Sequence, residues 1–153
     1  MPSFEYRNGK MVPMEDIVIS ESGDVHENIN RTLVIQNEAT VTSYGTINGT
    51  VQLTPGTTLD ARGSINGTVN VQRDATATFH AGLNGTLNVN RGGLARLAPT
   101  AVSLGTKHID GTLINEGVRG IQVSGSGTVE DLPGSTVRQP DEVRPDGGVV
   151  YRG

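Results

Sequence analysis

Aliphatic residues recur at every sixth position along the middle of the chain. Stepping by six from residue 29 gives twelve aliphatic positions in succession: Ile29, Ile35, Val41, Ile47, Leu53, Leu59, Ile65, Val71, Ala77, Leu83, Val89 and Ala95. The residue two before each following member is also small or aliphatic, as at Leu33, Val51, Val69 and Leu87. Alternate side chains of a strand face opposite sides. The pattern therefore predicts short strands over 29–98 with odd-numbered residues inward and even-numbered residues outward.

The third odd position of each six has a mixed character, which predicts corners between the strands. These positions are Gly49, Pro55, Ala61, Gly67, Arg73, Phe79, Gly85, Arg91 and Leu97. Glycine, proline and arginine are suited to a bend where a side chain looks outward. We therefore expect a chain that turns after every six residues.

A longer period joins three of these units into one repeat. The motifs INRTL, INGTV, INGTV and LNGTL place an asparagine at Asn30, Asn48, Asn66 and Asn84, each 18 residues after the last. Three six-residue strands per repeat predict triangular coils that stack at the ordinary strand spacing of about 4.8 Å. The fold class predicted is all-β: a single-domain parallel β-helix of six to seven coils, with Asn-Gly at a corner rather than in a hairpin.

The repeat weakens towards both ends and predicts the domain limits. Residues 1–16 contain their own Asn-Gly and are predicted to form a hairpin or cap, the β-helix to span 17–137, and the charged, proline-containing 138–153 to form a second cap or tail. The next regular copy after the one at Leu83 should begin at residue 101, whereas the motif IDGTLIN begins at Ile109. Eight extra residues are therefore expected as an insertion near 99–108.

The composition limits the kinds of partner that the protein can bind and the cellular compartment in which we expect it. The chain has 153 residues, only 34% of them hydrophobic, with no cysteine and a net charge of −4. Disulfides and thiolate metal sites are excluded, and the acidic balance argues against nucleic acid as a partner. No apolar stretch reaches the roughly 18 residues of a membrane span, and MPSFEYRNGK lacks an apolar signal core. We expect a soluble, cytoplasmic protein.

The three histidines are the candidates for catalysis or metal binding. His26 and His80 share one phase of the repeat but lie three coils apart, about 14 Å by stacking. His108 follows the expected insertion and could approach His80. We expect all three to be surface residues, and no phosphate-binding loop, nucleophile elbow or Cys/His spacing is present. The sequence thus predicts no catalytic residue, metal or cofactor.

Other polar patterns have ordinary explanations. The Asn-x-Thr sequons at 30, 48, 66 and 84 are expected to be products of the repeat, without glycosylation. Threonines are expected in an outward column, namely Thr32, Thr50, Thr68, Thr86, Thr112 and Thr128, with pairs at Thr40-x-Thr42 and Thr76-x-Thr78. Such pairs resemble ice-binding arrays, but Asp60 and Arg96 interrupt them. Glu38, Asp60 and Asp74 are expected around corners as solvated charges.

The segment GTINGTVQLTPGTTLDARGSINGTVNV at 45–71 resembles the bactofilins, which are polymer-forming bacterial scaffold proteins. The resemblance covers 29–98 and implies a right-handed triangular β-helix that assembles end to end without nucleotide. The expected insertion and the short flanks depart from that family. The same six-residue rhythm also resembles the left-handed hexapeptide-repeat acyltransferases.

These observations predict a non-catalytic structural scaffold that self-associates end to end or laterally. The sequence is also consistent with two alternatives. One is a discrete protein-binding module, for example an acidic inhibitor or an immunity-type protein, with capped ends. The other is a trimeric acyltransferase or zinc enzyme with His80 and His108 at a subunit interface.

Overall fold

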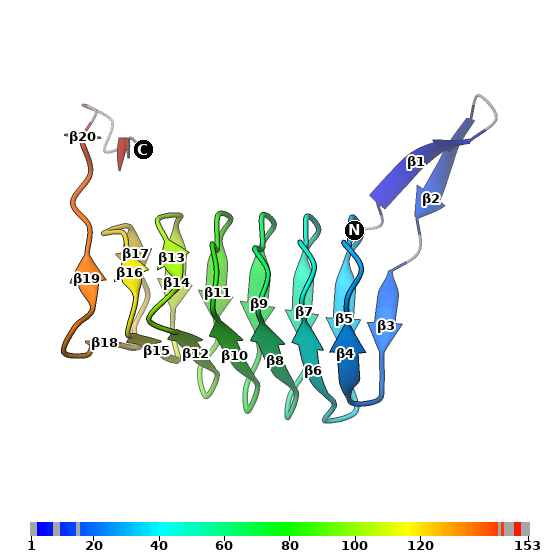
Figure 1. Ribbon diagram of the computed structural model, residues 1–153, viewed down its shortest axis with the longest axis horizontal. Coiled ribbons are helices and arrows are strands. Elements are labelled where there is room, and N and C mark those ends of the chain that lie inside the picture. The colour runs from blue at the N-terminus through cyan, green and yellow to red at the C-terminus, as the bar shows by residue number, and fades with distance from the viewer. Residues whose placement is uncertain (1–2, 8–9, 15, 144, 146–148, 151–153) are drawn as a thin grey trace.

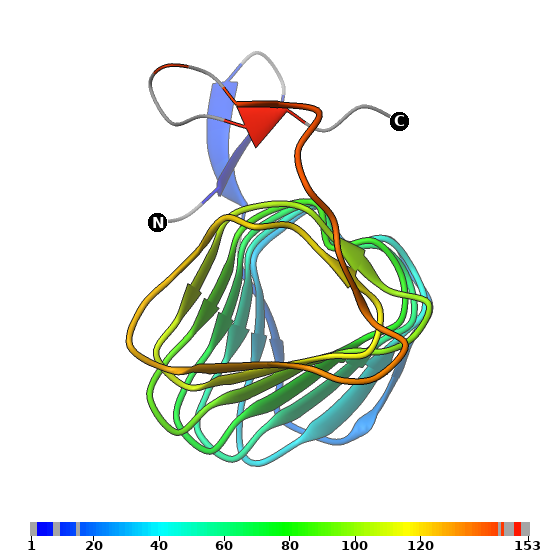
Figure 2. The same cartoon turned by 90° about the vertical axis from the view of Figure 1, so that its left-hand side faces the viewer.

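The computed structural model describes residues 3–7, 10–14, 16–143, 145 and 149–150. All regular elements within these residues are strands, and a parallel β-solenoid of about seven coils occupies 17–137 (Figure 1). The predicted all-β fold with triangular coils of roughly 18 residues is thereby confirmed, and Figure 2 shows the three-sided cross-section.

Two seven-stranded parallel sheets form two sides of the solenoid. The first sheet contains β3 (Ile17–Ile19), β5 (Leu33–Ile35), β7 (Val51–Leu53), β9 (Val69–Val71), β11 (Leu87–Val89), β14 (Lys107–Ile109) and β17 (Val123–Ser124). The second sheet contains β4 (Gly23–Val25), β6 (Thr40–Ser43), β8 (Thr58–Ala61), β10 (Thr76–Phe79), β12 (Leu94–Leu97), β15 (Thr112–Asn115) and β18 (Thr128–Asp131).

The third side is less regular. Single parallel bridges join Ile29, Ile47, Ile65 and Leu83 in its first half. In its second half β13 (Val102–Ser103), β16 (Val118–Arg119) and β19 (Thr136–Val137) form a short parallel sheet. Two antiparallel ribbons flank the solenoid: β1 (Ser3–Arg7) with β2 (Lys10–Met14), and β20 (Glu142–Val143) with β21 (Val149–Val150).

The core consists of aliphatic ladders, as the odd-inward prediction requires. In the first sheet Leu33, Val51, Val69 and Leu87 stack in register from coil to coil and are fully buried. Each layer repeats the one below, so small and medium side chains form one continuous core along the rod. This is how a chain with 34% hydrophobic residues folds.

The corner positions fall into three kinds, which the sequence pattern had grouped together. Pro55, Arg73 and Arg91 are exposed at turns, whereas the glycines of the repeat are half-buried. Ala61, Phe79 and Leu97 instead end the strands of the second sheet and are buried in the core. The strands of the second sheet are longer than those of the first, so one corner residue per coil stays inside.

The glycine of each Asn-Gly pair is required by close packing between coils. None of these glycines has a positive φ. A Cβ on Gly49 would lie 2.0 Å from the carbonyl oxygen of Arg31, and one on Gly67 would lie 2.0 Å from that of Gly49. Asn-Gly therefore marks a corner, as predicted, because only glycine allows the backbones to stack so closely there.

The predicted eight-residue insertion near 99–108 is wrong. Leu87 pairs with Lys107, two positions beyond the regular step to 105, and Lys107 pairs with Val123, two positions short of the regular step to 125. Residues 102–103 and 107–109 are strands of the solenoid. The motif IDGTL at 109–113 does not repeat the corner of LNGTL, because Ile109 pairs with Val89 and Thr112 with Leu94.

Candidate functional site

The three histidines lie in separate places on the solenoid surface. The ring of His26 stacks on Tyr44, with centroids 4.7 Å apart. His80 Nε2 lies 2.7 Å from Asp60 Oδ1, while His108 belongs to β14 in the first sheet. Within the described part of the chain, no three His, Cys, Asp or Glu side chains gather as metal ligands.

Of the three histidines, His108 contacts both a serine hydroxyl and a carboxylate. Its Nδ1 lies 3.1 Å from the hydroxyl oxygen of Ser124, and its Nε2 lies 2.9 Å from Asp110 Oδ2. The other carboxylate oxygen of Asp110 accepts hydrogen bonds from the Ser126 amide and hydroxyl. The Ser126 amide, foremost, holds the pKa of Asp110 below its usual value. The His108 side chain is half exposed, so this arrangement is a solvated surface network.

Asp60 does not lie at a corner, as the sequence pattern predicted, but within β8. Its two oxygens contact His80 and the Nε of Arg62. Glu38 and Asp74 are corner residues, and both have a positive φ at the turn between the first and second sheets. Gly56 and Gly92 adopt a positive φ at the equivalent turns of the neighbouring coils. These acidic residues therefore occupy a turn position for which glycine is better suited.

The threonines form two rows, and the predicted single column is wrong at its end. Thr32, Thr50, Thr68 and Thr86 precede successive strands of the first sheet, and Thr106 continues their row. Thr112 and Thr128 belong instead to a row of the second sheet that comprises Thr40, Thr58, Thr76, Leu94, Thr112 and Thr128.

Exposed asparagines form a hydrogen-bonded ladder along one edge. The Nδ2 group of Asn48 donates to Asn30 Oδ1, Asn66 donates to Asn48, and Asn84 donates to Asn66, at 2.7–2.8 Å. The ladder links successive coils through side chains and gives the repeated asparagine a structural role.

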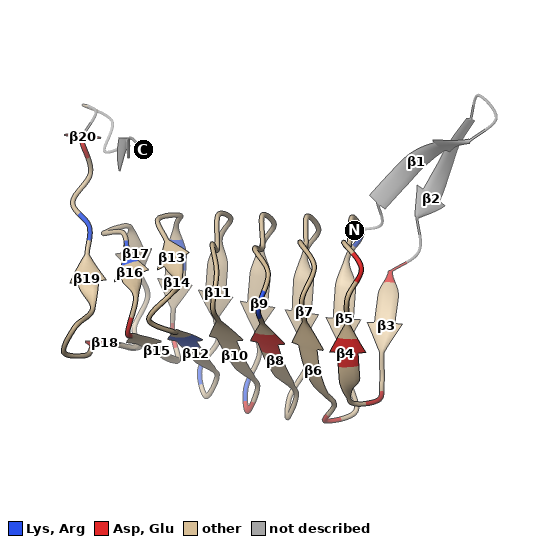
Figure 3. Cartoon of the chain, in the orientation of Figure 1, with Lys and Arg blue, Asp and Glu red and all other residues tan. Residues whose placement is uncertain are grey.

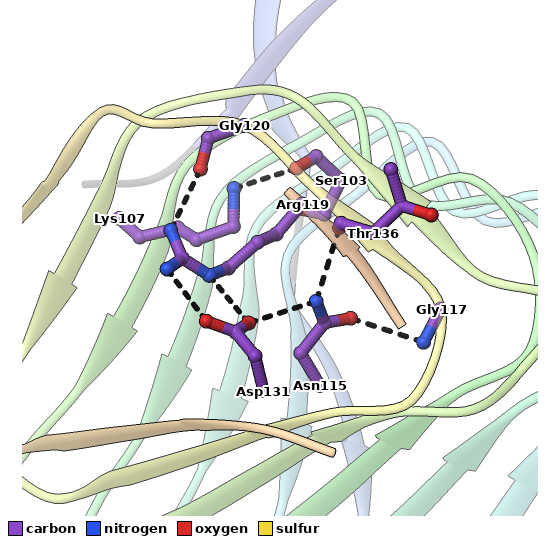
Figure 4. Close-up of polar contacts among 8 residues, drawn as sticks. All are labelled: Ser103, Lys107, Asn115, Gly117, Arg119, Gly120, Asp131 and Thr136. Atoms are coloured by element: carbon purple, nitrogen blue, oxygen red, sulfur yellow. Dashed lines mark hydrogen bonds and ion pairs between the residues drawn. The ribbon is translucent and has the colours of Figure 1, made fainter. Parts of the chain in front are cut away.

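A group of polar side chains interrupts the aliphatic ladders near the C-terminal end. We call Ser103, Lys107, Asn115, Arg119 and Asp131 the C-terminal polar cluster (Figure 4). Lys107 follows Leu87 in its ladder, is fully buried, and donates from Nζ to the carbonyl oxygens of Ser103 and Gly105, each at 2.8 Å. Desolvation, with a smaller contribution from the Arg119 charge, lowers the pKa of Lys107 to about 8.

Arg119 and Asp131 form the charged pair of this cluster. Arg119 donates from Nε and Nη2 to the two oxygens of Asp131, at 2.8 and 2.9 Å. Asn115 donates to Asp131 at 3.0 Å, and its own oxygen accepts the amide of Gly117 (Figure 4). The bond from Arg119, foremost, lowers the pKa of Asp131. The cluster adds hydrogen bonds between the last two coils beside the apolar core, which continues to Val129.

Sequence reasoning missed this cluster because the register was assigned incorrectly after Leu97. Aligning GTLNV at 85–89 with GTKHI at 105–109 places Lys107 on the inward position of Leu87. That alignment is the signal that would have revealed a lysine inside the solenoid.

The two ends of the solenoid are the remaining candidate site. At the N-terminal end β3 and β4 are the outermost strands of their sheets, and at the C-terminal end β17, β18 and β19 are outermost. Ile17, Ile19 and Val25 at one end, and Val123 and Val129 at the other, are only partly buried against the core. Both ribbons stand beside the triangular cross-section rather than across it (Figures 1 and 2).

Charge is distributed unevenly along the solenoid (Figure 3). Residues 16–30 contain four exposed carboxylates, Asp16, Glu21, Asp24 and Glu27, and no lysine or arginine. Residues 31–138 contain eight basic and seven acidic side chains. The first coil is therefore the acidic part of the described solenoid.

None of the described residues forms a helix that could cross a membrane. Comparison of the chain with protein-family models, with curated proteins and with solved structures finds no match.

Proposed function

We propose that the protein is a non-catalytic structural scaffold that self-associates through the ends of its solenoid. The observation that carries this proposal is the pair of uncovered ends, each with outermost strands and partly exposed aliphatic side chains. An open strand edge is a template for pairing with another chain. The resemblance of residues 45–71 to the polymer-forming bactofilins supports the same function.

The backbone at each end has hydrogen-bonding groups that point along the rod axis. Inside the solenoid, Leu33 donates forward to Thr50, while Asn48 donates backward to Ile29. Since parallel strands alternate in this way, the last coil directs the N–H and C=O groups of Val129 and Asp131 towards its open edge. The first coil does the same with Val18 and Asp24. A second copy satisfies these groups.

A discrete protein-binding module is the second candidate, and the acidic first coil favours it. Four exposed carboxylates without a basic neighbour in 16–30 would attract a basic partner. In that case the protein would be monomeric, and the N-terminal end would hold the partner.

Sedimentation velocity and electron microscopy over a wide range of concentration test the scaffold function. We expect species larger than the monomer that grow with concentration. A control variant with Thr50→Glu charges a side of the rod without altering either end and is expected to associate as the wild type does. A wild type that is monomeric at every concentration contradicts the proposal. If the wild type associates and the control variant does not, the contact is made by a side of the rod and not by its ends.

A further inference from the structure

We infer that two copies join C-terminal end to C-terminal end, so that the assembly is a closed pair of rods. This inference rests on the proposed function, because it specifies which ends make the contact. Two rods can join through their ends in three ways: head to tail, through both N-terminal ends, or through both C-terminal ends. The rows of residues along the solenoid distinguish these possibilities.

A head-to-tail joint brings like charges together. The solenoid has an outward row in the second sheet that begins at Asp24 and ends at Glu130, with Thr42, Asp60, Thr78, Arg96 and Ile114 between them. If the coils of a second copy continue the same stack, Glu130 lies beside Asp24 of that copy at the strand spacing of about 4.8 Å. Like charges directly opposite each other destabilise a strand pair.

The neighbouring interior row of the second sheet also disfavours the head-to-tail joint. It runs from Val25 through Ser43, Ala61, Phe79 and Leu97 to Asn115 and Asp131. A head-to-tail joint therefore stacks Val25 of one copy on Asp131 of the other. Asp131 keeps its bonds from Arg119 there, but the joint replaces water over this ion pair with an aliphatic side chain that offers no hydrogen bond, which is costly.

Contact between two N-terminal ends concentrates negative charge. Asp24 is the residue of β4 whose backbone groups point to the open edge, so a symmetric pairing of β4 sets Asp24 opposite its own copy. A pairing centred on Val18 of β3 avoids that contact, but it still brings four exposed carboxylates from each copy to one joint. Both arrangements are repulsive at moderate salt.

Contact between two C-terminal ends pairs the open strand edges without placing like charges opposite each other. A two-fold axis perpendicular to the rods reverses the direction of the second chain, so the open edges meet antiparallel. When the axis passes Val129, the open-edge groups of the two Val129 residues bond each other and their side chains meet inside. Thr128 then faces Glu130 of the second copy on the outside, an uncharged residue opposite a charged one.

The C-terminal end also has its interior charge already partnered. Asp131 accepts hydrogen bonds from Arg119 and Asn115 of its own chain, and pairing about Val129 sets it opposite Gly127 of the second copy, which has no side chain to cover it. Figure 1 shows the segment after β19 leaving sideways from the last coil, whereas the β1–β2 ribbon extends beyond the first coil. The C-terminal face is therefore open to a second rod.

Charge substitutions at Thr128 test this joint, because Thr128 is exposed. Thr128→Glu places like charges opposite each other on both sides of the two-fold axis and is expected to weaken dimerisation about tenfold. Thr128→Lys places opposite charges there and is expected to tighten it by a similar factor. Thr40→Glu, an exposed position of the same row in the second coil, is the matched control and is expected to leave the dissociation constant unchanged. Sedimentation equilibrium measures all three against the wild type.

The possible outcomes distinguish failure of the C-terminal pairing from failure of the scaffold function. A monomeric wild type overturns both. Filaments or other species larger than a dimer support the scaffold function and overturn the closed pair. A dimer that is insensitive to both Thr128 substitutions, or equally sensitive to Thr40→Glu, also overturns it.

Distance measurements between spin labels give an independent test. The chain has no cysteine, so Val18→Cys and Thr128→Cys each provide a single labelling position. Pairing through the C-terminal ends gives a short separation for labels at 128 and roughly 60 Å for labels at 18, from the coil spacing. The reverse pattern, short at 18 and long at 128, overturns the inference.

Discussion

At the scale of single residues, Lys107 is the side chain whose energetics depart most from the rest of the described interior. It occupies a ladder position that Leu33, Val51, Val69 and Leu87 fill in preceding coils. Its amine is held by two backbone carbonyl oxygens and is fully buried. Desolvation of a cation costs stability unless a carboxylate compensates it.

Lys107→Met is expected to stabilise the protein at pH 7 by about 2 kcal/mol, because the desolvation cost exceeds the two lost hydrogen bonds. The pKa of Lys107 is lowered from 10.5 to about 8 in the folded state. Between these values the unfolded chain binds the proton and the folded chain does not, so wild-type stability rises with pH in this window. The difference between variant and wild type should therefore shrink from pH 8 to pH 10.5.

Denaturant unfolding of both proteins across this pH range measures the effect. The only other lysine is Lys10, which both proteins share, so it cancels in the difference. A constant difference across the whole window would contradict the assigned cause.

At the scale of the coil, stacking depends on glycines that let backbones approach. A Cβ on Gly67 would lie 2.0 Å from the carbonyl oxygen of Gly49, and backbone cannot move aside without opening the joint between two coils. Gly67→Ala is therefore expected to destabilise the protein by about 3 kcal/mol, measured as a fall in thermal midpoint.

Gly23→Ala is the control for this effect. No heavy atom lies within 4 Å of a Cβ placed on Gly23, and its φ is not positive. We expect a change within about 0.5 kcal/mol of zero. Equal losses in the two variants would show that general backbone entropy, and not close approach, determines the role of Gly67.

At the scale of the whole molecule, a stack of coils is most stable where each coil has a neighbour on both sides. The aliphatic residues that line the core between 33 and 97 are buried, whereas Val123 and Val129 in the last coil are partly exposed. The rod is therefore expected to open from its ends.

Native-state hydrogen exchange tests this gradient. Amides of β7, β9 and β11 should exchange with the global free energy of unfolding, and those of β17 and β18 should exchange faster by local opening. Self-association through the C-terminal end should slow exchange in β18 as the concentration rises. Uniform protection along the rod would contradict a stack that frays from its ends.

The sequence by itself determined the parts of this fold that depend on local periodicity. Alternation places Leu53 and Val71 inside and Gln52 and Asn70 outside, because a strand has a period of two. The regular spacing of Asn48 and Asn66 predicts triangular coils, because each coil must present the same residue types to the next. These features follow from neighbouring residues and needed no knowledge of contacts between coils.

Only the tertiary structure decided how the irregular coils align. IDGTL at 109–113 resembles the earlier corners in sequence, yet it lies on a different part of the coil because Lys107 pairs with Leu87. The step from Leu87 to Lys107 is two residues longer than the repeat, and the step from Lys107 to Val123 is two residues shorter. Backbone pairing between coils, and not the local motif, selects this register. The same register places Lys107 in the core and joins Arg119 to Asp131, a contact between coils that no repeat could predict.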